Sequence, residues 1–382
     1  MFNLIEVITS MGIDANTFRT CFSVIVPFVV SLALGWLFVP RVLLLSRKKH
    51  LYDIPDYRKL HTSPIPRLGG VTFFPVLLMS FCLTVGFWIL FSMDGVLVDV
   101  DSYMARFILL TVGMMGLFLT GVTDDLIGVS YQAKFVVQFL CAMLFPLSGL
   151  WLNDFSGLFW LHTIPAWLGV AITVFLIVYV MNAVNLIDGV DGLASGLCSI
   201  ALFTFGLAAA MKGQYLFCMA SFGMLGVLIP FWFYNVFGSA DRGKKIFMGD
   251  TGSLTLGFLL SFLIVYLSGL DKDSSPKGML LIGLSTLLIP LMDIPRVMLA
   301  RIRQGRNPFT PDTNHIHHKL MRAGLSPKCT MAFLLGASAF LVAFTLLLIH
   351  LGCDLTLILL LEVALDVALH IAINRFIAKK ER

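Results

Sequence analysis

The stretch IPAWLGVAITVFLIVYVMNA (residues 164–183) contains no charged side chain over its 20 positions. A helix needs about 20 mostly apolar residues to cross the hydrocarbon core of a bilayer. The stretch runs directly into VNLIDGVDG (184–192), which combines amide and carboxylate side chains with glycines. This succession predicts a membrane-spanning helix whose polar end carries chemistry.

The composition extends this pattern to the whole chain. Of the 382 residues, 58% are hydrophobic and 13% charged, and the mean hydropathy is +0.91, whereas a soluble chain carries about 25% charged residues. These values argue against a soluble enzyme, a disordered chain and a secreted disulfide scaffold. We predict an all-α, polytopic integral membrane protein with about eleven transmembrane helices. The predicted spans lie near residues 21–45, 71–92, 105–122, 134–152, 164–183, 194–211, 214–236, 253–270, 278–295, 329–350 and 354–374.

The basic residues predict the orientation of these spans. When alternate connections are assigned to opposite sides, 22 of the 27 Lys and Arg residues fall on one side and 5 on the other. Cytoplasmic connections carry the excess of Lys and Arg, so we expect the N-terminus outside and the C-terminus in the cytoplasm. We treat residues 1–382 as a single domain whose motifs lie between residues 53 and 324, in connections on the cytoplasmic side.

The third predicted span ends in DDLIG (124–128), and Lys134 follows. Successive helical residues point about 100° apart, so two adjacent carboxylates converge only at a helix end, where Gly128 lets the backbone turn. Asp124 and Asp125 would there hold Mg²⁺ or perform acid–base chemistry. The alternative is a pair of solvated charges.

The fifth span ends in a second polar motif. Asn182, Asn185 and Asp188 follow one another at intervals of three residues and are neighbours on a helix surface. Gly189 and Gly192 then end the helix and expose backbone N–H groups. Amides, carboxylates and N–H groups together suit a sugar nucleotide with its metal ion, and a polar loop with one helix cap is the alternative.

The eighth span opens with KKIFMGDTGS (244–253). Unpaired N–H groups at this positive helix end predict a phosphate site. Asp250 would bind Mg²⁺ beside it, and Phe247 would offer a ring face to a base. A helix cap alone is the alternative.

The longest cytoplasmic connection carries Arg301 and the cluster His315, His317 and His318 among further arginines and two prolines. This composition predicts an anion-binding lid. Zinc is the competing hypothesis, although no Cys or Glu lies nearby to complete a ligand set. The arginines alone could simply determine topology.

Two other segments are less specific. The basic, proline-rich loop 53–70 would bind phosphates or anionic lipid, or only fix the topology. Glu362, Asp366 and His370 lie on one face of the last span. Intramembrane ionisable groups are functional candidates, and mutual pairing is the alternative.

Taken in order, these motifs resemble those of the polyprenyl-phosphate N-acetylhexosamine-1-phosphate transferases, glycosyltransferase family 4. The resemblance spans residues 53–324, and it includes the Asp-Asp, Asn-x-x-Asn-x-x-Asp-Gly-x-Asp-Gly and Phe-Met-Gly-Asp-x-Gly-Ser motifs. It implies Mg²⁺ as cofactor, with Mn²⁺ as an alternative, uracil near Phe247 and Asp191, and a phosphate contact from Lys134. The catalytic candidates are then Asp124, Asp125 and Asp188, the metal ligands Asp250 and Asp188, and the substrate-binding candidates Lys134, Asn182, Asn185, Asp191, Phe247, Arg301, His315, His317 and His318.

The segment NPFTPDTNHIHH (307–318) looks like the branch of this family that uses UDP-N-acetylglucosamine or a relative, since the peptidoglycan translocases carry three consecutive histidines. The resemblance implies transfer of an N-acetylhexosamine 1-phosphate from a UDP-sugar to undecaprenyl phosphate, with release of UMP, at the start of cell-envelope polysaccharide synthesis. Direct attack and a covalent aspartyl intermediate both remain open.

The expected location is the bacterial cytoplasmic (inner) membrane. The expected partners are the UDP-sugar, the lipid phosphate and the bilayer, without nucleic acid, and a homodimer is an alternative to the monomer. The rival function is a transporter or flippase of nucleotide-linked or lipid-linked sugars, which should place polar groups near mid-span and show repeated halves.

Overall fold

The computed structural model describes residues 9–12, 14–53, 64–91, 100–270, 278–308 and 312–380. The two strands among these residues are β1 (Tyr52–Asp53) and β2 (Ile65–Pro66), which pair antiparallel with Tyr52 opposite Pro66. The other regular elements of the described ranges are helices. They are α2 (Ala15–Lys48), η1 (Gly69–Thr72), α3 (Phe73–Leu90), α4 (Val100–Ile127), α5 (Tyr131–Leu147), η2 (Leu158–Trp160), α6 (Ala166–Ile187), α7 (Leu193–Met211), α8 (Tyr215–Trp232), η3 (Phe233–Phe237), α9 (Gly249–Gly269), α10 (Met279–Thr286), α11 (Leu288–Arg303), α12 (Ile316–Ala323), α13 (Pro327–His350) and α14 (Leu355–Lys380).

The helices confirm an all-α, multi-pass membrane protein. In the described part of the chain, nine helices are long and apolar enough to cross a bilayer, and α10 with α11 makes a tenth if that bent pair is one span. Helix α5 is apolar but shorter, at 17 residues. Each predicted range thus contains a helix or a helix pair, while the number of eleven spans and the orientation stay predictions.

The chain forms two compact units. The first unit comprises Met1–Asp53, Ile65–Leu150 and Leu202–Thr255, and the second comprises Ile54–Pro64, Trp151–Ala201 and Leu256–Arg382. Each unit holds part of the sequence motifs. Part of the basic loop, residues 54–63, lies outside the described residues.

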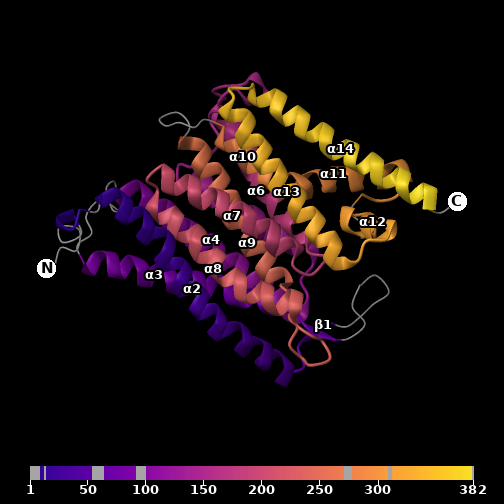
Figure 1. Cartoon of the computed structure of the whole chain (residues 1–382), viewed down its shortest axis with the longest axis horizontal. Coiled ribbons are helices and arrows are strands. Elements are labelled where there is room, and N and C mark those ends of the chain that lie inside the picture. Colours follow the sequence, from indigo (N-terminus) through magenta and orange to yellow (C-terminus); the bar gives the residue numbers. More distant parts are fainter. Residues whose placement is uncertain are drawn as a thin grey trace. The chain divides into compact units, whose positions relative to one another are not determined.

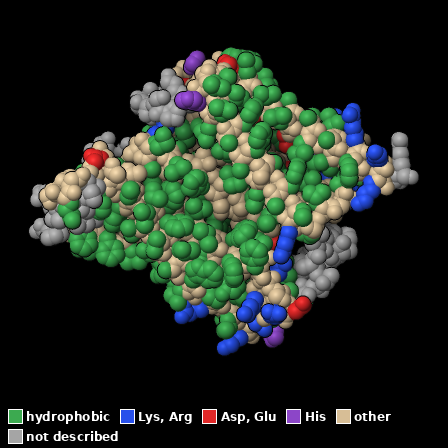
Figure 2. Space-filling model, in the orientation of Figure 1, with side chains coloured by type: hydrophobic (Ala, Val, Ile, Leu, Met, Phe, Trp, Pro, Cys, Tyr) green, Lys and Arg blue, Asp and Glu red, His purple; other side chains and the backbone are tan. Residues whose placement is uncertain are grey.

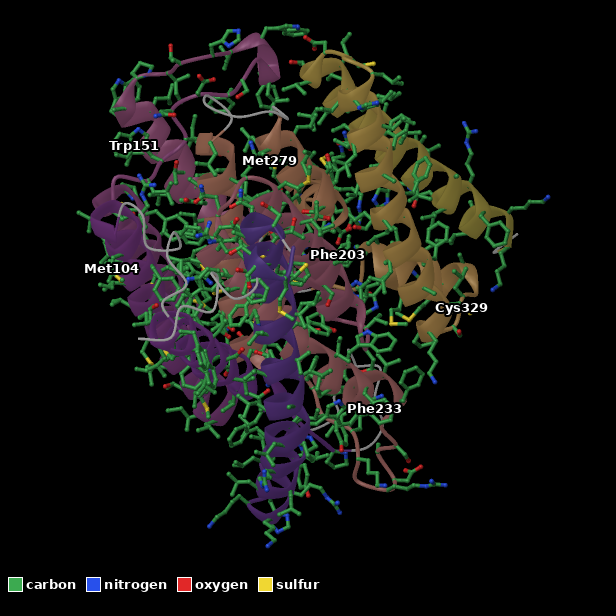
Figure 3. All side chains as sticks on the ribbon, turned by 60° about the vertical axis from the view of Figure 1, so that its left-hand side comes forward. Met104, Trp151, Phe203, Phe233, Met279 and Cys329 are labelled. Atoms are coloured by element: carbon green, nitrogen blue, oxygen red, sulfur yellow. The ribbon has the colours of Figure 1, made fainter. Side chains whose placement is uncertain are left out.

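In the first unit, α2, α3 and α8 lie side by side (Figure 1). Glycines let their backbones approach closely, because a Cβ at Gly226 would lie 2.5 Å from the carbonyl oxygen of Phe28, and one at Gly35 would lie 2.9 Å from Pro230. Such small residues are typical of helix contacts inside a bilayer. Helix α8 continues into the π-helix η3 at Phe233 (Figure 3). The side-chain amide of Asn235 in η3 donates to the carbonyl of Ile246 at 2.8 Å, which fixes the segment that leads into α9.

The surface of the first unit separates apolar and basic side chains. Hydrophobic side chains cover much of the face in view, and Lys and Arg gather where α2 ends (Figure 2). The exposed apolar residues include Ile25, Val29 and Leu83, and the last turn of α2 carries Arg47 and Lys48. An apolar wall with a basic end is what a lipid-facing helix requires.

In the second unit, α10 and α11 are bent by 66° at Leu287. The hydroxyl of Ser338 on α13 donates to the carbonyl of Thr286 at 3.1 Å, so the broken helix has a partner for one of its last carbonyls. Glu362 on α14 is fully buried and accepts hydrogen bonds from Ser285, at 2.8 Å, and from Thr345.

The other two ionisable groups of the last span lie together. Asp366 and His370 are buried on α14, with 3.8 Å between carboxylate and imidazole. Asp366 and His370 are therefore close enough to pair, and a functional role of this polar face stays a prediction.

The contact of α4 with the start of α9 yields a prediction. A Cβ at Gly121 would lie 2.4 Å from Thr251 Cα and 2.7 Å from its nitrogen. We expect Gly121→Ala to destabilise the protein by about 1–3 kcal/mol, the usual cost of overpacking, and to lower its melting temperature in detergent. Gly86→Ala on α3 is the matched control, since its Cβ would meet no atom within 4 Å. Equal melting temperatures of the two variants would contradict this close approach.

Candidate active site

One candidate group lies in the first unit and joins two carboxylates through a lysine. Asp124 is in the last turn of α4, Lys134 in the first turn of α5 and Asp250 in the first turn of α9. The Nζ atom of Lys134 is 3.0 Å from Asp124 Oδ2 and 2.7 Å from Asp250 Oδ2. All three side chains are partly exposed, so a solute can reach them. We call these three residues the carboxylate–lysine group.

The turn after α4 holds Asp124 in place. Its Oδ1 atom accepts the backbone N–H of Val129 at 2.7 Å. The turn requires the left-handed backbone of Gly128, whose φ is +78°. The first turn of α5 then brings Lys134 back toward α4, ten residues beyond Asp124 in sequence. The helix end was expected to bring Asp124 and Asp125 together on one ion or proton. In the structure it brings Asp124 to Lys134 instead.

Asp125 has a different role, because its buried carboxylate caps α9. Its oxygens accept the N–H groups of Asp250, at 2.9 Å, and of Thr251, at 3.1 Å, and the hydroxyl of Thr251 at 2.7 Å. Arg67 Nε lies 3.9 Å away. Helix starts leave such N–H groups without an intrahelical partner. The expectation that the first N–H groups of α9 are unpaired and bind phosphate is therefore corrected: Asp125 occupies two of them.

Phe247 precedes α9 in a segment that is tied to residues 66–70. Its N–H donates to the carbonyl of Pro66 at 2.7 Å, and its carbonyl accepts from Gly69 at 2.9 Å. A Cβ at Gly70 would lie 2.2 Å from the nitrogen of Gly252. The glycines at the end of the basic loop thus serve close backbone packing against the start of α9, a role that the charge pattern did not reveal.

The second unit carries the other motif residues. Asn182 donates from Nδ2 to the carbonyl of Val178 at 2.7 Å within α6. Asn185 lies in the last turn of α6, and Asp188 is its exposed C-cap residue. Asp191 is half-buried in the turn before α7. The helix thus ends after Ile187, as the glycines predicted.

The histidine cluster meets this motif in the second unit. A Cβ at Gly189 would lie 2.3 Å from Nε2 of His317, so the imidazole packs directly on the glycine. The rings of His315 and His317 are stacked with centroids 5.8 Å apart, and those of His317 and His318 are 4.3 Å apart. The histidine cluster and the Asn-Asp motif therefore lie next to each other within one unit.

His317 and His318 do not act as simple cations. His317 is 1% exposed, and burial together with nearby His318 and His315 lowers its pKa to about 3. Burial also lowers the pKa of His318. A neutral imidazole still donates one N–H, so the half-buried His318 can hydrogen-bond an anion without bringing a positive charge.

Arg301 is engaged within the loop that follows α11. Its guanidinium donates to both oxygens of Asp312, at 3.0 and 3.1 Å, and to the carbonyl of Pro308. Burial raises the pKa of Asp312, but hydrogen bonds from Arg301 and Asn314 hold it at about 2. Arg301 thus shapes the described parts of the loop, and residues 309–311 lie outside the described residues.

Asp293, which belongs to none of the sequence motifs, is 2% exposed in α11. Its carboxylate binds Arg296, His315 and the N–H of Ile316. An aspartate inside an apolar segment was the available signal.

The described residues contain no cluster of three or more His, Cys, Asp or Glu side chains that could hold a metal ion. Asp124 and Asp250 nevertheless offer carboxylate oxygens to one Lys134 nitrogen. One or two carboxylates completed by substrate phosphates are a common Mg²⁺ environment, so the carboxylate–lysine group fits that ion. The histidines offer imidazole without the cysteine or carboxylate partners that a structural zinc site uses.

Comparisons with known proteins identify the family. The family model for glycosyl transferase family 4 matches residues 107–268. A probable undecaprenyl-phosphate N-acetylglucosaminyl 1-phosphate transferase of Bacillus subtilis (strain 168) is 32% identical over 90% of this chain and 92% of its own length. Undecaprenyl-phosphate alpha-N-acetylglucosaminyl 1-phosphate transferases of Yersinia pestis and Escherichia coli (strain K12) are 30% and 29% identical, over 82% and 79% of this chain and 80% and 77% of theirs.

The family model covers the carboxylate–lysine group and the Asn-Asp motif, and the Bacillus relative aligns over nearly the full length of both chains. This chain is therefore a member of glycosyl transferase family 4.

Proposed function

We propose that this protein transfers N-acetylglucosamine 1-phosphate from UDP-N-acetylglucosamine to undecaprenyl phosphate. An oxygen of the lipid phosphate attacks the β-phosphorus of the donor, the bond from that phosphorus to the bridging oxygen breaks, and UMP leaves with the bridging oxygen. The observation that carries the proposal is the carboxylate–lysine group, at the end of membrane helices, in a chain whose relatives are named for this transfer.

The carboxylate–lysine group would handle the phosphate charge. Lys134 would donate hydrogen bonds to a phosphate oxygen, and a fixed ammonium lowers the repulsion between the two anionic substrates. Asp124 would orient or deprotonate the lipid phosphate. We assign this step to Asp124 rather than Asp125, because Asp125 already accepts three hydrogen bonds from α9.

We further propose that Asp250 holds Mg²⁺, which would neutralise diphosphate charge when bound. The support is its partly exposed carboxylate at the start of α9. Asp188 as a further ligand, and Mn²⁺ as a replacement, stay predictions.

The Asn-Asp motif and the histidines would recognise the donor. Asn182, Asn185 and Asp191 offer amide and carboxylate groups for the sugar or the uracil, and His317 offers a neutral imidazole beside Gly189. Such hydrogen-bonding groups fit the recognition of a sugar and a base.

We place the reaction at the cytoplasmic face of a bacterial inner membrane, because Lys and Arg accumulate on the side that carries the motifs. The relatives reported above are named as transferases, which favours an enzyme over the transporter.

The defining test measures UMP release by the purified protein in lipid nanodiscs. We expect release only when UDP-N-acetylglucosamine, Mg²⁺ and undecaprenyl phosphate are all present, together with one lipid diphosphate sugar per UMP. UDP-N-acetylgalactosamine in parallel reports which hexosamine is used. Uptake of UDP-sugar into sealed vesicles without UMP would instead support the transporter and reject the proposal.

A substitution tests the carboxylate–lysine group. Asp250→Asn keeps the shape and the backbone N–H that Asp125 accepts, but it removes the charge. We expect turnover to fall by at least about 100-fold, the scale of losing one electrostatic contact at a transition state, with an unchanged melting temperature. Asp241→Asn in the exposed loop before α9 is the control. Near-normal turnover of Asp250→Asn at saturating Mg²⁺ would remove Asp250 from this role.

Two native cysteines test the orientation. Cys329 lies in the first turn of α13 (Figure 3) and Cys353 beyond its other end, and both are exposed. In variants that keep one of these cysteines and replace the others by serine, a membrane-impermeant maleimide should label Cys353 in intact cells. It should label Cys329 only after permeabilisation. The reverse pattern would invert the topology and move the motifs to the outer face.

A further inference from the structure

The buried carboxylate of Asp293 holds the beginning of the histidine helix α12. Its Oδ2 atom is 2.7 Å from Nδ1 of His315, and its Oδ1 atom accepts the N–H of Ile316 at 3.0 Å. The side chain is 2% exposed. Burying a carboxylate costs free energy unless hydrogen-bond donors surround it, so these hydrogen bonds offset the cost of burying Asp293.

Arg296 completes the arrangement on the other side. It donates from Nη2 to Asp293 Oδ1 at 2.5 Å and to the carbonyl of Asn314 at 2.6 Å. Asp293 and Arg296 together therefore contact three consecutive residues, from Asn314 to Ile316. Asp293 serves as the cap of α12, since the side chain of His315, the N-cap residue, makes no capping hydrogen bond.

The same contact selects one tautomer of His315. An ionised carboxylate has no hydrogen to give, so Nδ1 of His315 must be the donor. Nε2 is then the nitrogen left for a ligand. A carboxylate behind an imidazole commonly fixes the ring orientation in this way.

The position of α12 also sets the position of His317. Its ring is stacked on that of His315, with 4° between their planes, and it packs on Gly189 next to Asp188. Helix α11, which carries Asp293, is tied to α6 by a hydrogen bond from the Tyr179 hydroxyl to the carbonyl of Leu291. Tyr179 lies one turn before Asn182, so one helix contact places Asp293 relative to the motif.

We propose that Asp293 is a positioning residue for donor recognition: it holds His315 in one tautomer and holds α12 so that His317 meets the Asn-Asp motif. The proposal rests on the proposed function, because the recognised ligand is the UDP-sugar. Asp293 itself does not touch the substrate. It acts through His315 and α12.

The kinetic test replaces Asp293 by Asn, which keeps the size. The amide would donate to His315 Nδ1 and so reverse the tautomer. We expect kcat/KM for UDP-N-acetylglucosamine to fall by about 100-fold, since a wrong imidazole tautomer costs orders of magnitude in rate, while KM for undecaprenyl phosphate changes less than about twofold. Asp354→Asn is the control, because Asp354 also accepts backbone N–H groups at a helix start in the same unit, that of α14, and we expect it to keep wild-type kcat/KM for the donor.

A double-mutant cycle separates positioning from general stability. In a His315→Ala background, adding Asp293→Asn should lower kcat/KM for UDP-N-acetylglucosamine by less than about a further threefold. The reason is that the effects of residues that act through one contact are not additive. The proposal would be overturned if the losses in kcat/KM of the two single variants multiplied in the double variant. It would also be overturned if KM for undecaprenyl phosphate rose as much as kcat/KM for the donor fell.

The hydrogen on His315 can also be observed directly in the wild-type protein. In ¹⁵N-histidine NMR of the wild-type protein, with His315→Gln used for assignment, Nδ1 of His315 should carry a hydrogen. A bare Nδ1 would overturn the proposal whatever the activity. A wild-type protein that shows this hydrogen yet releases no UMP would reject the proposed function and, with it, the donor role of Asp293, but not the contact between Asp293 and His315.

Discussion

The carboxylate of Asp125 accepts three hydrogen bonds from the start of α9, and the other charged groups of the first unit are arranged around this contact. A buried carboxylate must receive donors, and the start of a helix has N–H groups without partners. The carboxylate therefore accepts the N–H groups that the helix start leaves free, and this contact fixes the end of α4 against the beginning of α9. That contact is possible because Gly121 and Gly249 leave room for backbone and carboxylate, respectively. It also brings Asp250 to Lys134.

The second unit meets the same requirement with a different pair of elements. Asp293 is buried in α11, and it takes its donors from the beginning of α12 and from Arg296. In both units a helix start is capped by an aspartate from another helix. The acceptor therefore fixes a tertiary contact as well as a helix end. Such contacts suit an apolar bundle, in which hydrophobic burial does not by itself select one helix register.

The two units differ in the chemistry that they offer to a substrate. The first unit presents two carboxylates around an ammonium group, which suits phosphate charge and a divalent ion. The second presents amides, an exposed aspartate and imidazoles that burial keeps neutral. In the proposed reaction, phosphoryl chemistry would belong to the first set and recognition of the sugar nucleotide to the second.

The sequence by itself determined the fold class and the motif positions. Apolar runs of helical length predict membrane helices, because a bilayer leaves backbone groups no partner outside the helix. The glycines after Asp124 and Asp188 correctly predicted the helix ends at these motifs. Only the tertiary structure decided what the individual polar groups do. Asp124 and Asp125 are adjacent and chemically identical, yet one meets Lys134 and the other caps α9.

Asp293 and Arg301 were similarly undetermined by the sequence, because their partners lie 22 and 11 residues away along the chain. A charged residue in the sequence shows which chemistry is available, whereas its hydrogen-bond partners depend on which helices pack together. Packing also decides whether an imidazole is charged, since burial rather than residue type lowers the pKa of His317.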